Sequence, residues 1–182
     1  MTRLVVLDRD GVINHDSDHF IRSVDEWRPI AGSAAAIGRL AAAGYTVAVA
    51  TNQSGIGRGF LRREELTAIH KKMQQHAELA GGHIDRIVFC PHLPDAGCDC
   101  RKPKPGLLEQ LGAHYAIDLR GVPVIGDSER DLQAAEAVGA RPVLVLTGNG
   151  RNTRAARVAA DDPVEAYDDL AAAVDALISE KT

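Results

Sequence analysis

Aromatic residues are scarce in this chain of 182 residues, since Phe, Trp and Tyr together make up 4% of it. So few aromatic side chains offer few surfaces on which nucleic-acid bases could stack. The net charge of -4 at pH 7, with both signs mixed along the chain, also provides no basic surface for nucleic acid or for an anionic membrane. We therefore expect a small soluble partner, with neither nucleic acid nor a membrane involved.

Long hydrophobic runs are also missing. The first apolar run covers residues 4–7 and stops at Asp8, so it is too short for the core of a signal peptide. No other stretch approaches the length that a transmembrane helix needs. We expect a cytoplasmic protein that folds as a single domain over residues 1–182 and is a monomer.

Cysteine is rare, and all three cysteines, Cys90, Cys98 and Cys100, lie within the proline-rich segment 90–105. A disulfide is one interpretation, but it would leave one thiol over and would have to persist in a reducing compartment. With His92 the cysteines form C-x-H followed by C-x-C, which supplies three thiolates and one imidazole. Because this is the ligand set of a closed structural site, we expect Zn²⁺ to order the loop without taking part in chemistry.

Hydrophobic periodicity predicts alternating strands and helices. Residues 4–7 are aliphatic without alternation, which is typical of a strand that is buried on both faces. Ser33 is expected to cap a helix that Gly44 ends. The predicted strands are 4–7, 45–50, 84–89, 122–125 and 143–146, and the predicted helices are 33–44, 64–79, 107–115, about 132–138 and 164–178. This alternation indicates an α/β fold, a doubly wound parallel sheet with helices on both faces and no large cap domain.

Polar residues follow three of the predicted strands. Asp8 and Asp10 come after the first, Thr51 ends the second, and Asp127 follows the fourth; Lys102 precedes a helix and so lies on the same edge. Carboxylates gathered there repel one another, so a hard cation such as Mg²⁺ should share the site. Taken singly, each residue has an ordinary structural explanation, as a turn, a surface charge or a helix start. Together, in this order and on these strands, they favour phosphoryl transfer.

The chain resembles the haloacid dehalogenase superfamily of phosphohydrolases over nearly its whole length, which implies that superfamily's Rossmann-like fold. Its motifs stand here as Asp8-Arg9-Asp10-Gly11, as Thr51 in Val-Ala-Thr-Asn-Gln-Ser, as Lys102 in Arg-Lys-Pro-Lys-Pro, and as Gly126-Asp127 with Asp131 four residues on. The resemblance implies that Asp8 is a nucleophile that forms an aspartyl-phosphate. Asp10 would act as general acid and then as general base.

The same resemblance implies a metal site and a phosphoryl site. Mg²⁺ would be held by Asp8, by the backbone carbonyl of Asp10 and by Asp127, while Thr51 and Lys102 would bind the phosphoryl oxygens. The sequence leaves open whether Asp131 supports the metal site or faces solvent. It also leaves open the roles of Ser128 and Arg58, whereas His70 and His76 are interpreted as solvated or packing histidines.

Within the superfamily, the motifs D-R-D-G-x-I-N, T-N-Q-S-G and C-D-C-R-K-P in this order are similar to those of the D,D-heptose 1,7-bisphosphate 7-phosphatases. These enzymes belong to ADP-heptose and lipopolysaccharide core precursor synthesis, so the resemblance implies removal of a 7-phosphate from a sugar bisphosphate. Related histidinol-phosphate phosphatases and other small sugar-phosphate phosphatases are the alternative. The resemblance places eight residues against the sugar or its distal phosphate: Asp16, Ser17, Asp18, His19, Asn52, Gln53, Ser54 and Arg101.

This chain departs from the heptose pattern in two places. It has Asp18-His19-Phe20 where those enzymes carry a glycine and a tyrosine, and Ser128 where they carry a lysine. The anomer of the substrate therefore stays open.

Two other classes of protein compete with the phosphatase interpretation. A signalling receiver domain also combines Mg²⁺, an acceptor aspartate, a threonine and a lysine on a doubly wound sheet. Receivers lack an acidic residue two positions after the acceptor, so Asp10 argues against this class. A zinc-stabilised binding module with a vestigial site is the other alternative, but no catalytic position has been lost here.

Overall fold

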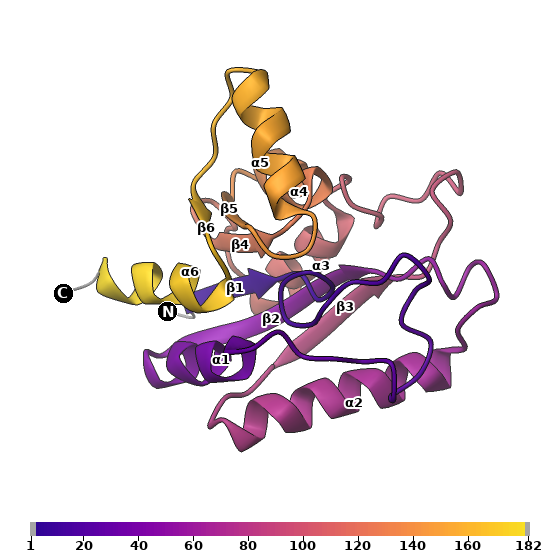
Figure 1. Cartoon of the computed structure of the whole chain (residues 1–182). Helices are drawn as coiled ribbons and strands as arrows, with labels where there is room; N and C mark the ends of the chain where they lie inside the picture. Colours follow the sequence, from indigo (N-terminus) through magenta and orange to yellow (C-terminus); the bar gives the residue numbers. More distant parts are fainter. Residues whose placement is uncertain (1–2, 181–182) are drawn as a thin grey trace.

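Six parallel strands form one sheet in the order β3-β2-β1-β4-β5-β6 in the computed structural model, which describes residues 3–180 (Figure 1). The strands are β1 (Arg3–Leu7), β2 (Tyr45–Asn52), β3 (Arg86–Cys90), β4 (Pro123–Gly126), β5 (Arg141–Val145) and β6 (Ala166–Tyr167). The helices are α1 (Ser33–Ala42), α2 (Arg63–Leu79), α3 (Gly106–Tyr115), α4 (Glu129–Ala137), α5 (Gly150–Ala159) and α6 (Leu170–Ser179). The predicted doubly wound α/β fold is confirmed.

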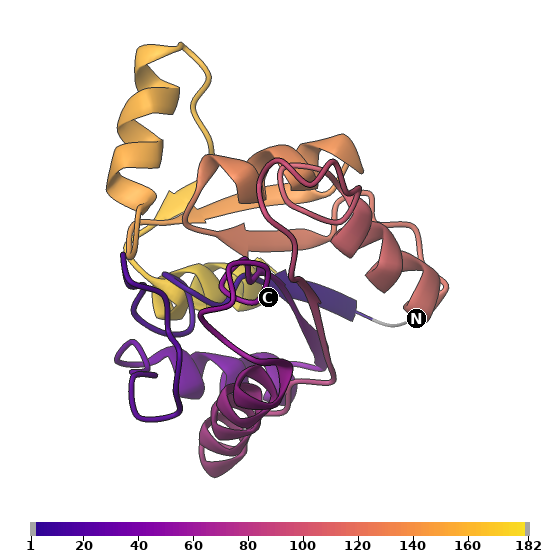
Figure 2. The same cartoon turned by 90° about the vertical axis from the view of Figure 1, so that its right-hand side faces the viewer.

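Strand β1 lies in the middle of the sheet and is buried on both faces. Val5 and Leu7 pack in the hydrophobic cluster that includes α1, α2 and α6, whereas Leu4 and Val6 pack in the cluster that includes α3 and α4. Figures 1 and 2 show these two groups of helices on opposite sides of the sheet. This double burial explains why the apolar residues of β1 do not alternate with polar ones.

The chain reverses its direction of winding at β1. It proceeds from β1 to β2 and β3 on one side and then crosses to β4, β5 and β6 on the other. In open parallel sheets, ligands bind beyond the carboxyl ends of the strands at such a switch point. A ligand site is therefore expected among the residues that follow β1 and β4.

No separate cap covers this edge within residues 3–180, where the connection from β1 to α1 is an irregular loop. None of the helices in the same part of the chain is both long and apolar enough to span a bilayer.

Two local predictions were wrong, and one helix was missed. Ser33 is the first residue of α1 and not its cap, because Gly32 takes the cap position with φ 83° and the Ser33 hydroxyl is buried without a hydrogen-bond partner. The predicted helix 164–178 begins only at Leu170, after the short strand β6. Helix α5 was not predicted, because its sequence is polar overall and offers few apolar residues.

Ion pairs with other parts of the chain hold α5 in place. The buried Arg157 side chain forms ion pairs of 2.8 Å with Glu129, 2.9 Å with Glu136 and 2.5 Å with Asp162. Two of these partners belong to α4, so tertiary contacts decide that this segment packs there as a helix.

Candidate active site

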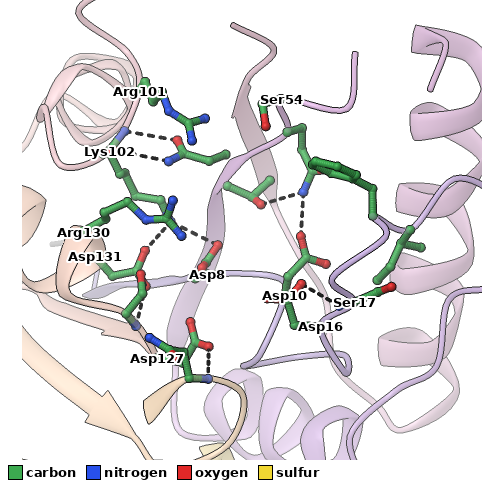
Figure 3. Close-up of a pocket in the computed structure, with 17 residues that line it drawn as sticks. Asp8, Asp10, Asp16, Ser17, Ser54, Arg101, Lys102, Asp127, Arg130 and Asp131 are labelled. Atoms are coloured by element: carbon green, nitrogen blue, oxygen red, sulfur yellow. Dashed lines mark hydrogen bonds and ion pairs between the residues drawn. The ribbon is translucent and has the colours of Figure 1, made fainter. Parts of the chain in front are cut away.

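A cavity of about 420 Å³ opens at the carboxyl edge of the sheet, over the switch point (Figure 3). Its walls come from the segments that follow β1, β2 and β4, from the loop before α3 and from the start of α5. The lining residues are Asp8, Asp10, Asp16, Ser17, Phe20, Ile21, Thr51, Asn52, Gln53, Ser54, Arg101, Lys102, Asp127, Ser128, Arg130, Asp131 and Asn149. The structure thus brings together acids that are far apart in the sequence, as the motifs predicted.

Lys102 is buried beside Asp8. Its Nζ atom lies 3.0 Å from Oδ1 of Asp8 and 2.6 Å from Oδ1 of Asp131, and it donates a hydrogen bond of 2.8 Å to the carbonyl of Ala50. Burial disfavours the ammonium, but Asp131 and Asp8 together raise the pKa of Lys102 above its ordinary value. Lys102 is therefore a fixed positive charge next to Asp8.

Asp131 points into the site and does not face solvent. Its Oδ2 atom accepts hydrogen bonds from the backbone N–H of Ser128, at 3.0 Å, and from the Ser128 hydroxyl, at 2.6 Å. The bond from the Ser128 N–H is one half of a capping box at the start of α4, and the other half is the Asp131 N–H bond to the Ser128 hydroxyl. Because both Asp131 oxygens already have partners, its first role is to hold Lys102.

Three carboxylates, those of Asp8, Asp127 and Asp131, each place an oxygen within 4.8 Å of the others. Burial, followed by repulsion from Asp131 and Asp127, raises the pKa of Asp8, and burial with repulsion from Asp131 raises the pKa of Asp127 to about 7. A single lysine does not balance this charge, whereas a divalent cation with a preference for oxygen ligands would. The residues present therefore fit Mg²⁺, with Asp8 and Asp127 as its carboxylate ligands.

The Asp10 side chain is turned away from this cluster. Arg9 binds it through Nη2, 2.7 Å from Oδ1, and Asn14 and Gln53 each donate a further hydrogen bond of 2.9 Å. Burial alone would raise the pKa of Asp10, but Arg9 and these hydrogen bonds hold it below its ordinary value. The structure therefore holds Asp10 as a carboxylate, with only its backbone carbonyl left for a metal.

His70 packs against this arrangement and does not line the main cavity. Its Nε2 atom lies 3.3 Å from Nη1 of Arg9, and its ring meets the edge of Phe89. Burial and the nearby Arg9 charge lower the pKa of His70 to about 3. A neutral imidazole accepts the Arg9 hydrogen bond, which agrees with the interpretation of His70 as a packing histidine.

Two residues predicted to contact the substrate have protein partners for their side-chain amides. Gln53 donates hydrogen bonds of 2.9 Å to both Asp10 and Thr51, and Asn52 exchanges bonds of 3.0 and 3.1 Å with the backbone of Lys102. Both residues line the cavity. The hydrogen bonds of Gln53 and Asn52 therefore hold Asp10, Thr51 and Lys102 in position.

The predicted substrate loop is only partly inside the main cavity. Asp16 and Ser17 line it, whereas Asp18 lines a neighbouring hollow of about 390 Å³. His19 is exposed and lines neither of these two cavities. Its predicted contact with substrate stays a prediction without support from this geometry.

Several lining residues were missed by the sequence analysis. Arg130 lies in the first turn of α4, three residues after Asp127, and Asn149 directly precedes α5. Helix starts at the carboxyl edge of a parallel sheet face the ligand site, so the position of Arg130 was a usable signal. Asn149 gave no such signal, because α5 itself was not predicted.

The cysteine segment forms a second group of ligand atoms. Cys90 Sγ lies 3.7 Å from Cys98 Sγ and 3.4 Å from His92 Nδ1, and this nitrogen lies 3.2 Å from Cys100 Sγ. A tetrahedral zinc ion with bonds of about 2.3 Å to sulfur sets two sulfurs roughly 3.8 Å apart. The spacing therefore fits Zn²⁺, and none of the three cysteines forms a disulfide.

Comparisons with known proteins agree with this geometry. A family model described as polynucleotide kinase 3 phosphatase matches residues 4–133, and a HAD-hydrolase-like model matches residues 99–173. A Pseudomonas putida relative, D-glycero-beta-D-manno-heptose-1,7-bisphosphate 7-phosphatase, is 53% identical over 97% of this chain and 99% of its own length. The Bordetella bronchiseptica protein of the same name is 49% identical over 98% of this chain and 99% of its own length.

A solved structure shares the fold closely. The crystal structure of D,D-heptose 1,7-bisphosphate phosphatase from B. bronchiseptica, complexed with magnesium and phosphate, superposes with a TM-score of 0.92 at 48% identity. The match covers 98% of this chain and 99% of that one.

Proposed function

Because the chain belongs to the haloacid dehalogenase-like phosphatase family that includes the D-glycero-β-D-manno-heptose-1,7-bisphosphate 7-phosphatases, we propose that it removes the 7-phosphate of this sugar bisphosphate. The observation that carries the proposal is the position of Asp8 at the switch point, 3.0 Å from the Lys102 ammonium and within 4.8 Å of Asp127. Membership of this family also excludes the alternative that the chain is a signalling receiver domain. We place the reaction in the synthesis of ADP-heptose, a precursor of the lipopolysaccharide core.

Asp8 acts as the nucleophile in this proposal. Its Oδ1 atom is held by Lys102 and by the backbone N–H of Arg9, at 2.7 Å, while Oδ2 has no hydrogen-bond partner within residues 3–180. Oδ2 is therefore free to attack the phosphorus, which breaks the bond from phosphorus to the sugar oxygen and leaves an aspartyl-phosphate. Covalent catalysis divides one difficult hydrolysis into two easier steps.

Asp10 manages the protons. In the free protein it is a carboxylate, so in this proposal it first takes up a proton as the substrate binds and gives that proton to the departing sugar oxygen. As a carboxylate again, it then takes a proton from the water that attacks the aspartyl-phosphate. Gln53 bridges Asp10 to Thr51, so the acid–base group and the phosphoryl-binding hydroxyl are fixed relative to each other. Bound Mg²⁺ would supply positive charge between the carboxylates and the phosphoryl oxygens.

Arg101 and Arg130 offer a place for the distal phosphate. Both line the cavity, and neither forms an ion pair with a carboxylate in the described part of the chain. Burial, and then repulsion from Arg130, lowers the pKa of Arg101. Two guanidinium groups that repel each other at a cavity mouth are stabilised by a phosphate dianion. A bisphosphate therefore fits this site better than a monophosphate does.

We further propose that Cys90, His92, Cys98 and Cys100 hold a structural Zn²⁺. Thiolate ligation requires reduced cysteines, which supports a cytoplasmic location. The single domain over residues 1–182 and the monomeric state also remain proposals. Among the described residues, the large exposed hydrophobic side chains are Phe60 in the loop before α2, Leu79 at the end of α2 and Val158 on α5. They are scattered, which supports a monomer, and light scattering would test this.

A phosphate-release screen tests the function. The α and β anomers of heptose 1,7-bisphosphate, fructose 1,6-bisphosphate and histidinol phosphate should be compared, with Asp8→Asn as the inactive control. We expect the β-heptose bisphosphate to give the highest kcat/KM. Equal or faster turnover of histidinol phosphate would refute the assignment.

A further inference from the structure

The Asp127 carboxylate is enclosed by two glycines from distant parts of the chain. Gly11, after β1, has φ 81°, and Gly148, after β5, has φ 55°. A Cβ atom at either position would lie 2.1 Å from Oδ2 of Asp127, and one at Gly148 would also lie 2.6 Å from Cα of Gly11. A side chain larger than hydrogen at Gly148 would therefore displace the Asp127 carboxylate.

The loop between β5 and α5, residues 146–149, also makes directional bonds to this region. The backbone N–H of Asn149 donates a hydrogen bond of 2.7 Å to Oδ2 of Asp127, and the Thr147 hydroxyl donates one of 2.6 Å to the Gly11 carbonyl. Thr153, in the following helix, donates 2.9 Å to the backbone carbonyl of Asp127. Asp127 is thus held through its side chain and its backbone.

These bonds determine which oxygen is left for a cation. Oδ2 is occupied by the Asn149 amide, whereas Oδ1 has no hydrogen-bond partner among residues 3–180. The Thr147 bond fixes Gly11, which follows the Asp8-Arg9-Asp10 segment directly. One loop therefore contacts both strand ends that carry the proposed metal ligands.

We propose that the β5–α5 loop, through Thr147, Gly148 and the Asn149 amide, positions Asp127 against the segment after β1 for binding of the divalent cation. This inference rests on the proposed function, since it concerns the metal site of the same reaction. The loop residues are positioning residues, because Thr147 bonds to the Gly11 carbonyl, Gly148 has no side chain, and Asn149 acts on Asp127 through its backbone N–H. Outer partners of metal ligands commonly change metal affinity by about 10- to 100-fold.

The test compares Gly148→Ala with Gly121→Ala. Gly121 has φ 73° and nothing within 4 Å of its would-be Cβ, so the control carries the same type of backbone strain without the clash. Mg²⁺ binding by the protein in the absence of substrate is measured by isothermal titration calorimetry. We expect the Kd of Gly148→Ala to rise at least about tenfold and that of Gly121→Ala to stay within about twofold.

Equal shifts in the two glycine variants, or a Kd of Gly148→Ala close to wild type, would overturn the inference. If Gly148→Ala does not fold, Thr147→Val and Thr147→Ser decide instead, because valine lacks the hydroxyl and serine keeps it. Weaker Mg²⁺ binding in Thr147→Val with recovery in Thr147→Ser supports the inference, and unchanged binding in both overturns it. Since no sugar is used, a wrong substrate assignment does not affect the result.

Discussion

The Lys102 ammonium lies 2.6 Å from Oδ1 of Asp131 at the base of the cavity, and both side chains are buried. This ion pair holds the Lys102 ammonium 3.0 Å from Asp8 and keeps the lysine side chain inside the cavity. A buried charge that loses one partner is strongly destabilised, because its desolvation is no longer compensated. Asp131 therefore acts on the reaction through Lys102.

Asp131→Asn should lower kcat by about 100-fold, because a misplaced Lys102 no longer meets the phosphoryl group. At saturating Mg²⁺ the free energy of unfolding should fall by about 3 kcal/mol, as urea denaturation would measure. Asp175→Asn is the matched control, since Asp175 pairs with Arg39 at 3.0 Å but its side chain is 66% exposed. That change should cost less than about 1 kcal/mol. Wild-type kcat in Asp131→Asn would contradict the role of the pair.

Asp10→Asn should slow both formation and hydrolysis of the aspartyl-phosphate, by about 10²- to 10⁴-fold, because each step needs a proton transfer. Rapid-quench measurement of the burst of released sugar would resolve the two rates. Asp25→Asn, in an exposed part of the loop before α1, should leave both unchanged. The acid–base assignment fails if neither rate changes in Asp10→Asn.

Cys98→Ser should lose the bound zinc and part of the folding free energy, since structural zinc contributes directly to folding. Metal analysis and thermal unfolding would measure both. Because Arg101 and Lys102 follow Cys100 directly, KM should rise as well. Asp95→Ser, at an exposed position of the same loop, is the control that should retain zinc. If metal analysis finds no zinc in the purified wild-type protein, the proposed zinc site is refuted.

Arg130→Ala should raise KM for the bisphosphate about tenfold and leave KM for a sugar monophosphate unchanged, because only the bisphosphate carries a distal charge. Steady-state kinetics with both substrates would measure this difference. Arg154→Ala, an exposed arginine on α5 that lines neither cavity, serves as control. Equal effects on both substrates would show that Arg130 does not bind the distal phosphate.

His70 should make the fold sensitive to acid. Its pKa is lowered to about 3 in the folded state, so the unfolded chain, with an ordinary histidine near 6.5, takes up a proton first as the pH falls. The stabilisation is therefore complete above about pH 6.5 and declines towards pH 3, by up to about 3 kcal/mol at pH 4. His70→Gln, which keeps an acceptor for Arg9, should remove this part of the decline.

Urea denaturation at pH 7 and pH 4 would measure the difference between wild type and His70→Gln. His83→Gln, at an exposed position, should follow the wild-type curve. A wild-type curve with the same acid loss as His70→Gln would show that His70 does not contribute.

Much of this molecule could be predicted from local pattern alone. The unalternating run before Asp8 indicated a strand buried on both faces, and β1 has that burial. Residues that end parallel strands must meet at one edge of the sheet, so the gathering of Asp8, Thr51 and Asp127 followed from strand order and polarity. The tight spacing of the cysteines and His92 likewise indicated one cluster, because short loops keep such residues close.

Other features depended on contacts between distant segments, and the hydrophobic periodicity of a single segment does not indicate such contacts. The polar sequence of α5 packs through the ion pairs of Arg157, and the β5–α5 loop reaches Asp127 and Gly11 only because β5 lies beside β4. The orientation of Asp131 also depended on such a contact. Its position in the sequence allowed it to face either the metal site or solvent, and the ion pair with Lys102 turns it into the site. The sequence by itself determined which chemical groups stand at the sheet edge, whereas packing of the whole chain decided how each group is held, because hydrogen-bond and ion-pair partners depend on three-dimensional distance.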